Sequence, residues 1–145
     1  MLGNTGLGKT HLSLSIANEV LSKGYSVIYD SIINILHKIE NEHFGRDKTN
    51  DTLSLINETE LLILDDLGTE YSSSFYVSTI YNIINTRLNA SKSTIISTNL
   101  SLAEIGDRYD ERIVSRITTM YNCMTFAGND VRYQKKQREM QKNDI

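Results

Sequence analysis

The stretch that decides the fold is "GNTGLGKT", residues 3–10. Its residues Gly3, Gly8, Lys9 and Thr10 match the pattern G-x-x-x-x-G-K-[ST]. Glycines allow consecutive backbone N–H groups to point into one concavity, and a helix that begins near Gly8 adds the positive end of its dipole. The stretch predicts a phosphate-binding loop, in which Lys9 would reach the β- and γ-phosphates and Thr10 would bind Mg²⁺. An ordinary glycine-rich turn before a helix is the alternative.

Helical and strand patterns alternate along the rest of the chain, which is typical of a parallel sheet covered by helices. Apolar residues at helical spacing predict helices over 9–23, 31–43, 51–58, 75–90 and 101–121, with Ser31 as a cap and a break near Gly106. Short β-branched or apolar runs predict four strands, at 25–30, 60–66, 93–99 and 123–127. We therefore expect an α/β fold.

Polar side chains follow two of these strands. Asp65 and Asp66 come directly after the apolar run "LLIL", and Asn99 ends the run "TIISTN". Ligands bind at the carboxyl edge of open α/β sheets, so these side chains are candidates for one site. Asp65 would hold Mg²⁺, Asp66 would polarise an attacking water, and Asn99 would orient that water. Capping or turn formation is the alternative for each of them.

Two arginines share a helix face in "DERIVSRI". Arg112 and Arg116 are four residues apart. Either could stabilise charge on a transferred phosphoryl group, and surface ion pairing with Asp110 or Glu111 is the alternative. The pattern alone does not choose between these roles.

In this order, the motifs "GNTGLGKT", "LLILDDLG", "STN" and "RYDERIVSRI" resemble the AAA+ ATPases of the DnaC/DnaI helicase-loader and IstB group. The resemblance implies a P-loop NTPase fold of three αβα layers with a mostly parallel sheet. It also implies an AAA+ core over residues 1–130, lacking most of the strand before the loop, and a basic C-terminal tail over 131–145.

The resemblance further implies a role for each matching residue. ATP and Mg²⁺ are the implied cofactors, with Thr10 and Asp65 at the metal. Lys9, Asp66, Asn99 (sensor 1) and Arg116 (arginine finger) would be catalytic, and Arg132 stands loosely at the position of sensor 2. The implied nucleotide-binding residues of Walker A and its surroundings are Gly3, Asn4, Thr5, Gly6, Leu7, Gly8, Lys9, Thr10, His11 and Arg132.

The resemblance also implies partners. They are a replicative helicase of the DnaB type, single-stranded DNA, and further copies of the chain in an AAA+ oligomer, because an arginine finger acts on ATP held by a neighbouring subunit. Helices within 31–58 match the insertion linked with single-stranded DNA in this group, and its positive charge would come from Lys38, His43, Arg46 and Lys48. An IstB-like transposition helper is the first alternative.

A truncated, non-catalytic nucleotide-binding fragment is the second alternative, because only Met1 and Leu2 precede the loop. On that interpretation the chain alone should be unstable or should aggregate, since strand edges would lack partners. The 145 residues carry a net charge of −3, one cysteine and no long apolar run. These features favour a cytoplasmic protein with no membrane segment.

Overall fold

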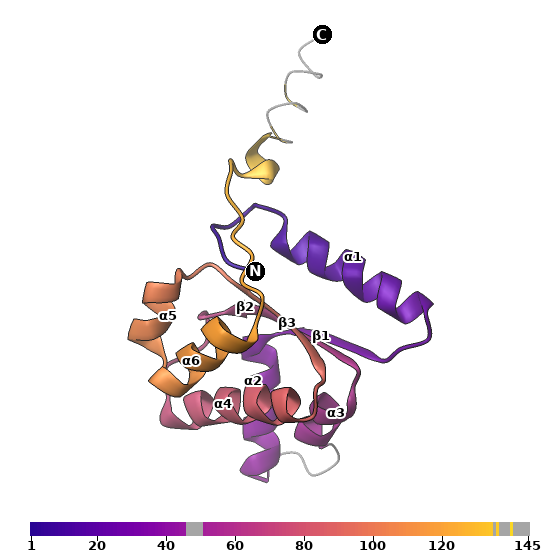
Figure 1. Cartoon of the computed structure of the whole chain (residues 1–145), viewed down its shortest axis with the longest axis vertical. Coiled ribbons are helices and arrows are strands. Elements are labelled where there is room, and N and C mark those ends of the chain that lie inside the picture. Colours follow the sequence, from indigo (N-terminus) through magenta and orange to yellow (C-terminus); the bar gives the residue numbers. More distant parts are fainter. Residues whose placement is uncertain (46–50, 135, 137–139, 141–145) are drawn as a thin grey trace.

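The computed structural model describes residues 1–45, 51–134, 136 and 140. Its sheet contains three parallel strands in the order β1 (Val27–Ser31), β2 (Leu61–Leu67) and β3 (Ser93–Thr98). Helix α1 (Lys9–Ser22) covers one face, and α2 (Ile32–His43), α3 (Thr52–Glu58) and α4 (Ser74–Asn89) lie on the other (Figure 1). The layered α/β fold expected from the sequence is confirmed.

Strand β2 is central because both of its faces are covered. Leu61 and Ile63 pack with Ala17 of α1. Leu62 and Leu64 point to the opposite face and join the larger apolar cluster, since successive side chains of a strand alternate between faces. This double burial explains why "LLIL" is an uninterrupted apolar run.

Met1 and Leu2 continue the sheet beyond β3. The Met1 amino group donates to Ile96 O at 2.8 Å, and Thr98 N donates to Met1 O at 3.0 Å. On the opposite side, Leu2 N donates to Met124 O at 2.8 Å. The two residues therefore lie between β3 and the segment around Met124, where the sequence predicted the strand that precedes the loop.

The prediction of a strand over 123–127 is wrong. This segment forms only an isolated parallel bridge, between Thr125 and Leu2. Upstream of that bridge, Asn122 and Cys123 line a cleft of about 460 Å³ together with residues of β3. Within the described residues the backbone pairing of this segment is therefore too short to make a strand.

Helices α5 (Leu102–Arg108) and α6 (Glu111–Met120) lie beside the sheet. The sequence placed their boundary near Gly106, which is wrong, because Gly106 lies inside α5. The boundary falls at Asp110, whose carboxylate accepts a hydrogen bond from Arg112 N and so caps α6. A glycine inside a helix costs only about 1 kcal/mol, so the cap decides the boundary. The predicted Ser31 cap of α2 is confirmed.

Residues 131–134 are helical and lie beyond the phosphate-binding loop, away from the sheet (Figure 1). The division between a core over 1–130 and a basic tail over 131–145 stays a prediction. Arg46, Lys48, Lys135, Arg138 and Lys142 lie outside the described residues. None of the helices in the described ranges is both long and apolar enough to cross a lipid bilayer.

Candidate nucleotide-binding site

The glycine-rich loop leads from Leu2 directly into α1. Gly8 is the N-cap of this helix, in the left-handed conformation with φ of 88°, and it makes no side-chain capping hydrogen bond. The N–H groups of the first helical turn therefore stay available for an anion, which the helix dipole also attracts.

Two glycines of the loop lie against close neighbours. A Cβ atom on Gly3 would lie 2.3 Å from Phe126 O, and one on Gly6 would lie 2.1 Å from the Asp130 carboxyl group. Both glycines also have positive φ, which other residues adopt only at a cost. In addition, Val131 N donates to Gly6 O at 2.9 Å. The loop is thus packed against the segment over 126–131.

Lys9 is buried at the centre of the loop. Its ammonium donates to Gly3 O, to Asn4 O at 2.8 Å and to Asn99 Oδ1 at 2.8 Å. Burial lowers the pKa of Lys9, and Arg132 adds to that effect against the opposing charges of Asp66 and Asp65. The loop lysine and the polar residue at the end of β3 are therefore in direct contact.

Asp65 is buried, and hydroxyl groups from three elements hold its carboxylate. Thr10 Oγ1 donates to Asp65 Oδ2 at 3.1 Å, and Tyr29 OH donates to the same oxygen at 2.6 Å. Ser97 Oγ donates to Asp65 Oδ1. Thr10 and Asp65 thus present a hydroxyl and a carboxylate oxygen to the same space, a donor set of the kind Mg²⁺ prefers.

Asp66 follows in a different environment, half-exposed and with φ of 57°. A residue other than glycine rarely adopts this left-handed conformation, and such residues gather at functional sites. Asp66 N donates to Ser97 Oγ at 3.0 Å. Because of this conformation the backbone at Asp66 departs from the extended geometry of the strand that carries Asp65.

Most of the predicted site residues line one cleft of about 820 Å³, a volume suitable for a small ligand. Gly3 and Asn4 are absent from its lining, but both supply carbonyl oxygens to Lys9. Leu14 and Val131 line the cleft without having been predicted. The predicted residues that line it are Thr5, Gly6, Leu7, Gly8, Lys9, Thr10, His11, Asp65, Asp66, Asn99 and Arg132.

Arg116 does not line this cleft and lies instead against Tyr81 of α4. Its Nη2 donates to Tyr81 OH at 3.3 Å, and its guanidinium carbon lies 5.4 Å from the centre of the Tyr81 ring. Arg112 stacks on the same ring at 5.0 Å and pairs with Asp110 at 2.7 Å. Both arginines are therefore separate from the nucleotide cleft of their own chain.

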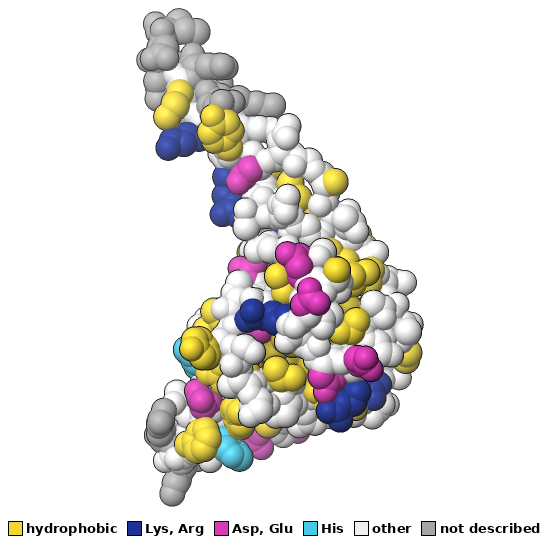
Figure 2. All heavy atoms as spheres, turned by 90° about the vertical axis from the view of Figure 1, so that its left-hand side faces the viewer, with side chains coloured by type: hydrophobic (Ala, Val, Ile, Leu, Met, Phe, Trp, Pro, Cys, Tyr) yellow, Lys and Arg dark blue, Asp and Glu magenta, His cyan; other side chains and the backbone are white. Residues whose placement is uncertain are grey.

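Figure 2 shows the face that carries α5 and α6. In the part of this face that the structure describes, acidic, basic and hydrophobic side chains are interspersed. Such a mixture suits contact with another protein surface better than with a nucleic acid backbone, which attracts a continuous basic patch.

Sequence reasoning missed three residues that contact the acidic pair or its turn, namely Tyr29, Ser97 and Glu70. Ser97 carried a usable signal, because it lies two residues before Asn99 in the predicted strand over 93–99, where alternate residues share a face. Tyr29 lies in the predicted strand over 25–30, yet nothing local indicates that its hydroxyl reaches Asp65. Glu70 lies outside every helix and strand predicted from the sequence.

The fold and the site together define a class of protein. A phosphate-binding loop opens α1, two acids lie near the carboxyl end of the central parallel strand and an asparagine follows the next one, which is the arrangement of an AAA+ P-loop NTPase domain. More particularly, residues 1–139 match the family of IstB-like ATP binding proteins, and the chain belongs to this family.

Comparison with characterised proteins agrees with this membership. The replicative helicase loader DnaC of Escherichia coli K12 is 27% identical over 117 residues, which cover 79% of this chain and 47% of DnaC. DnaC of Buchnera aphidicola subsp. Baizongia pistaciae is 25% identical over 136 residues, covering 92% of this chain and 55% of its own. The chain thus spans about half the length of these relatives.

Solved structures show the same likeness. A crystal structure of the DnaC helicase loader is 30% identical with a TM-score of 0.75, covering 87% of this chain and 76% of that one. AMPPCP-bound DnaA from Aquifex aeolicus has a TM-score of 0.78 at 24% identity, covering 99% of this chain and 45% of that one. At that identity the likeness to DnaA concerns the fold alone.

Proposed function

We propose that this chain is the ATP-binding and ATP-hydrolysing domain of a DnaC-like replicative helicase loader. The observation that carries the proposal is the convergence of Lys9, Thr10, Asp65, Asp66 and Asn99 on one cleft. The likeness to DnaC supports the link with helicase loading. Nucleotide state would then switch the hold of this domain on its partners.

Each residue has a role in this proposal. Lys9 would exchange its carbonyl partners for the β- and γ-phosphates, which a buried ammonium attracts strongly. Thr10 and Asp65 would hold Mg²⁺, which when bound neutralises charge on those phosphates. Their oxygens, 3.1 Å apart, are suitably placed to share one ion.

Asp66 and Asn99 would act on the attacking water. Asp66 would accept its proton, and Asn99 would orient it toward the γ-phosphate. Arg132 lines the same cleft and would add positive charge near the phosphates. Arg116 would complete the site of a neighbouring subunit, because it lies outside the cleft of its own chain. Self-association into an AAA+ oligomer follows from that role.

The proposals for the remaining partners rest on similarity to DnaC. The name of DnaC supports a replicative helicase as the partner. Single-stranded DNA would bind near α2, where Lys38 and the exposed His43 lie, although the Lys38 ammonium already pairs with Asp30 at 2.8 Å. The other two basic residues of this hypothesis, Arg46 and Lys48, lie outside the described part of the chain.

Binding of labelled ATP and release of phosphate by the wild type and by Lys9→Ala test the enzymatic proposal. The exposed Lys23→Ala is the matched control. We expect Lys9→Ala to weaken ATP binding on the order of 100-fold, because the phosphates lose their buried cation, and Lys23→Ala to behave as the wild type. Equal binding and hydrolysis in all three proteins would refute the proposal. ATP binding without hydrolysis would favour a non-catalytic nucleotide-binding domain.

A transposition helper is the second candidate function, and membership of the IstB-like family supports it. Co-purification distinguishes the two candidates. The loader should retain a replicative helicase in the presence of ATP, whereas a transposition helper should retain a transposase.

A further inference from the structure

Glu70 is a buried acid four residues after Asp66, and the proposed function leaves it without a role. It is 4% exposed, at the end of the turn that follows β2. A buried carboxylate is costly unless charged or polar groups compensate it. The contacts of Glu70 therefore indicate what this carboxylate does.

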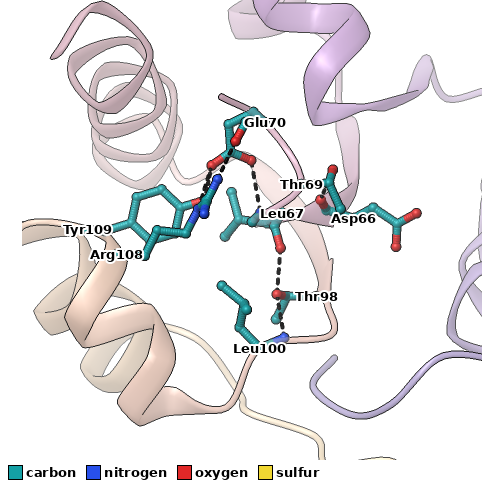
Figure 3. A network of polar contacts seen from close by, with 9 residues as sticks. Asp66, Leu67, Thr69, Glu70, Thr98, Leu100, Arg108 and Tyr109 are labelled. Carbon is teal, nitrogen blue, oxygen red and sulfur yellow. Dashed lines mark hydrogen bonds and ion pairs between the residues drawn. The ribbon is translucent and has the colours of Figure 1, made fainter. Parts of the chain in front are cut away.

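Both oxygens of the Glu70 carboxylate are engaged. Gly68 N donates to Oε2 at 2.9 Å, within the turn itself. On the other side, Arg108 Nε donates to Oε1 at 3.3 Å, and Tyr109 OH donates to the same oxygen. Arg108 also donates to the Glu70 carbonyl oxygen. The carboxylate thus joins the turn to the end of α5, as Figure 3 shows.

The turn that Glu70 joins to α5 sets the direction of Asp66. Asp66 has φ of 57°, and its carbonyl oxygen accepts from Thr69 N at 3.2 Å and from Thr69 Oγ1 at 2.7 Å. Gly68 has φ of 102°, and a Cβ there would lie 2.5 Å from Leu100 Cδ1. Such backbone conformations persist only where surrounding contacts fix them. In Figure 3 the Asp66 carboxylate points away from Glu70.

The same turn is joined to the end of β3. Thr98 Oγ1 donates to Leu67 O at 2.6 Å and accepts from Leu100 N at 3.1 Å (Figure 3). Asn99 lies between Thr98 and Leu100 in the chain. Hydrogen bonds therefore link the residue after Asp66 to the residues on both sides of Asn99, and Glu70 joins the same turn to α5.

The end of α5 leads directly along the chain to the helix that carries Arg112 and Arg116. Tyr109 follows α5 directly, and Asp110 then caps α6, which carries Arg112 and Arg116. One short run of chain therefore contacts the Glu70 carboxylate and starts the helix that bears both arginines.

We propose that Glu70 is a positioning residue, which fixes the Asp66 turn for water activation and couples that turn to the arginine-bearing helix pair α5–α6. This role rests on the proposed ATP hydrolysis. Loss of the Glu70 charge should misplace Asp66 without removing any group that touches the nucleotide. The competing interpretation is a buried ion pair that only stabilises α5.

Glu70→Gln keeps the shape of the side chain and removes its charge. We expect its kcat for ATP hydrolysis to fall about 10- to 100-fold, because misplacement of a catalytic group by about 1 Å has effects of this size. The Kd for ATP should stay within about two-fold of the wild type, since phosphate contacts are unchanged. The exposed Glu111→Gln, at the start of α6, is the matched control and should behave as the wild type.

Tyr109→Phe is the second variant, in case Glu70→Gln does not fold. It removes a single hydroxyl donor to Glu70 and should lower kcat by a smaller factor at unchanged Kd. A double variant, Asp66→Asn with Glu70→Gln, tests the route of the effect. If Glu70 acts through Asp66, the double variant should hydrolyse ATP no more slowly than Asp66→Asn alone.

Two results would overturn the inference. One is a kcat at the wild-type level in folded Glu70→Gln and Tyr109→Phe, even with a lowered melting temperature. The other is an additive loss of kcat in the double variant. These results differ from failure of the proposed function, in which the wild type itself does not bind or hydrolyse ATP, and which would overturn both proposals.

Discussion

The ammonium of Lys9 and the side-chain carbonyl of Asn99 meet at 2.8 Å, although 90 positions separate them in sequence. The contact joins the phosphate-binding loop to the end of β3. A phosphate group that attracts Lys9 competes with Asn99 for the same donor, so nucleotide binding would free the Asn99 side chain to contact water. This exchange gives Asn99 a physical means of responding to the nucleotide.

Asn99→Ala should therefore separate binding from hydrolysis. We expect ATP binding to be retained, because Lys9 loses an internal acceptor and keeps its phosphate contacts. Hydrolysis should fall about 10- to 100-fold, because the attacking water is no longer oriented. Equilibrium binding and single-turnover kinetics measure the two effects, with exposed Asn18→Ala as the control. A parallel loss of binding and turnover would contradict the assignment.

Tyr29→Phe should raise the Mg²⁺ concentration needed for ATP binding. The Tyr29 hydroxyl donates to Asp65 at 2.6 Å and orients the carboxylate that would hold the ion. Loss of a group that orients a metal ligand weakens metal affinity by about 10-fold or more. Titration of Mg²⁺ at fixed ATP measures the shift, and Tyr25→Phe, exposed just before β1, is the control. An unchanged Mg²⁺ midpoint would exclude this role.

Arg87→Leu should destabilise the fold strongly. Arg87 is fully buried, and its guanidinium donates to the carbonyl oxygens of Thr59 at 3.0 Å and of Ser93 at 2.6 Å, and also to Ile56 O. Leucine would leave these oxygens without donors, at a cost of roughly 3 kcal/mol or more in the free energy of unfolding. Urea unfolding measures the loss. Lys23→Leu, at the exposed C-cap of α1, should change stability by less than about 0.5 kcal/mol.

The stability of the fold should decline at alkaline pH through Tyr109. Burial raises the pKa of its hydroxyl above the ordinary value of 10.0, and the hydrogen bond to Glu70 raises it further. The folded state then keeps a proton that the unfolded chain releases, so this contribution is complete below about pH 10 and is lost as the pH rises above it. Tyr109→Phe should make the decline shallower, whereas Tyr71→Phe, on an exposed tyrosine, should leave its slope unchanged.

Mixing two inactive variants should restore hydrolysis if the sites are shared between subunits. Arg116→Ala should reduce turnover by at least about 100-fold while ATP binding persists, because a charge that stabilises the transition state is lost. Lys9→Ala subunits still carry Arg116 and can complete the site of an Arg116→Ala neighbour. Arg112→Ala, on the same α6 face, is the comparison and should retain more activity. No recovery in the mixture would argue against Arg116 as the finger.

The acids and the loop could be predicted because their signals are local. "GNTGLGKT" needs only its own glycines and the helix after it, and "LLILDD" needs only burial on both faces followed by charge. The break between α5 and α6 could not be placed, because a glycine signals a helix end only weakly when a capping aspartate lies nearby. The prediction of a strand over 123–127 was wrong because an apolar run does not indicate how many of its residues pair with a neighbouring strand.

Sequence alone determined the class of fold and predicted most of the residues that line the cleft. The spacing of apolar residues, the placement of glycines and the acids after a strand are signals that depend on a few neighbouring positions. Only the tertiary structure decided which side chains from other elements contact the acids and the turn after β2. Tyr29 reaches Asp65 because β1 and β2 pair in parallel, in a register that sets Tyr29 opposite Ile63. Glu70 meets Tyr109 because α5 packs beside the turn after β2, 39 positions away in sequence. Strand register and helix packing arise from the whole core, so no local pattern encodes them.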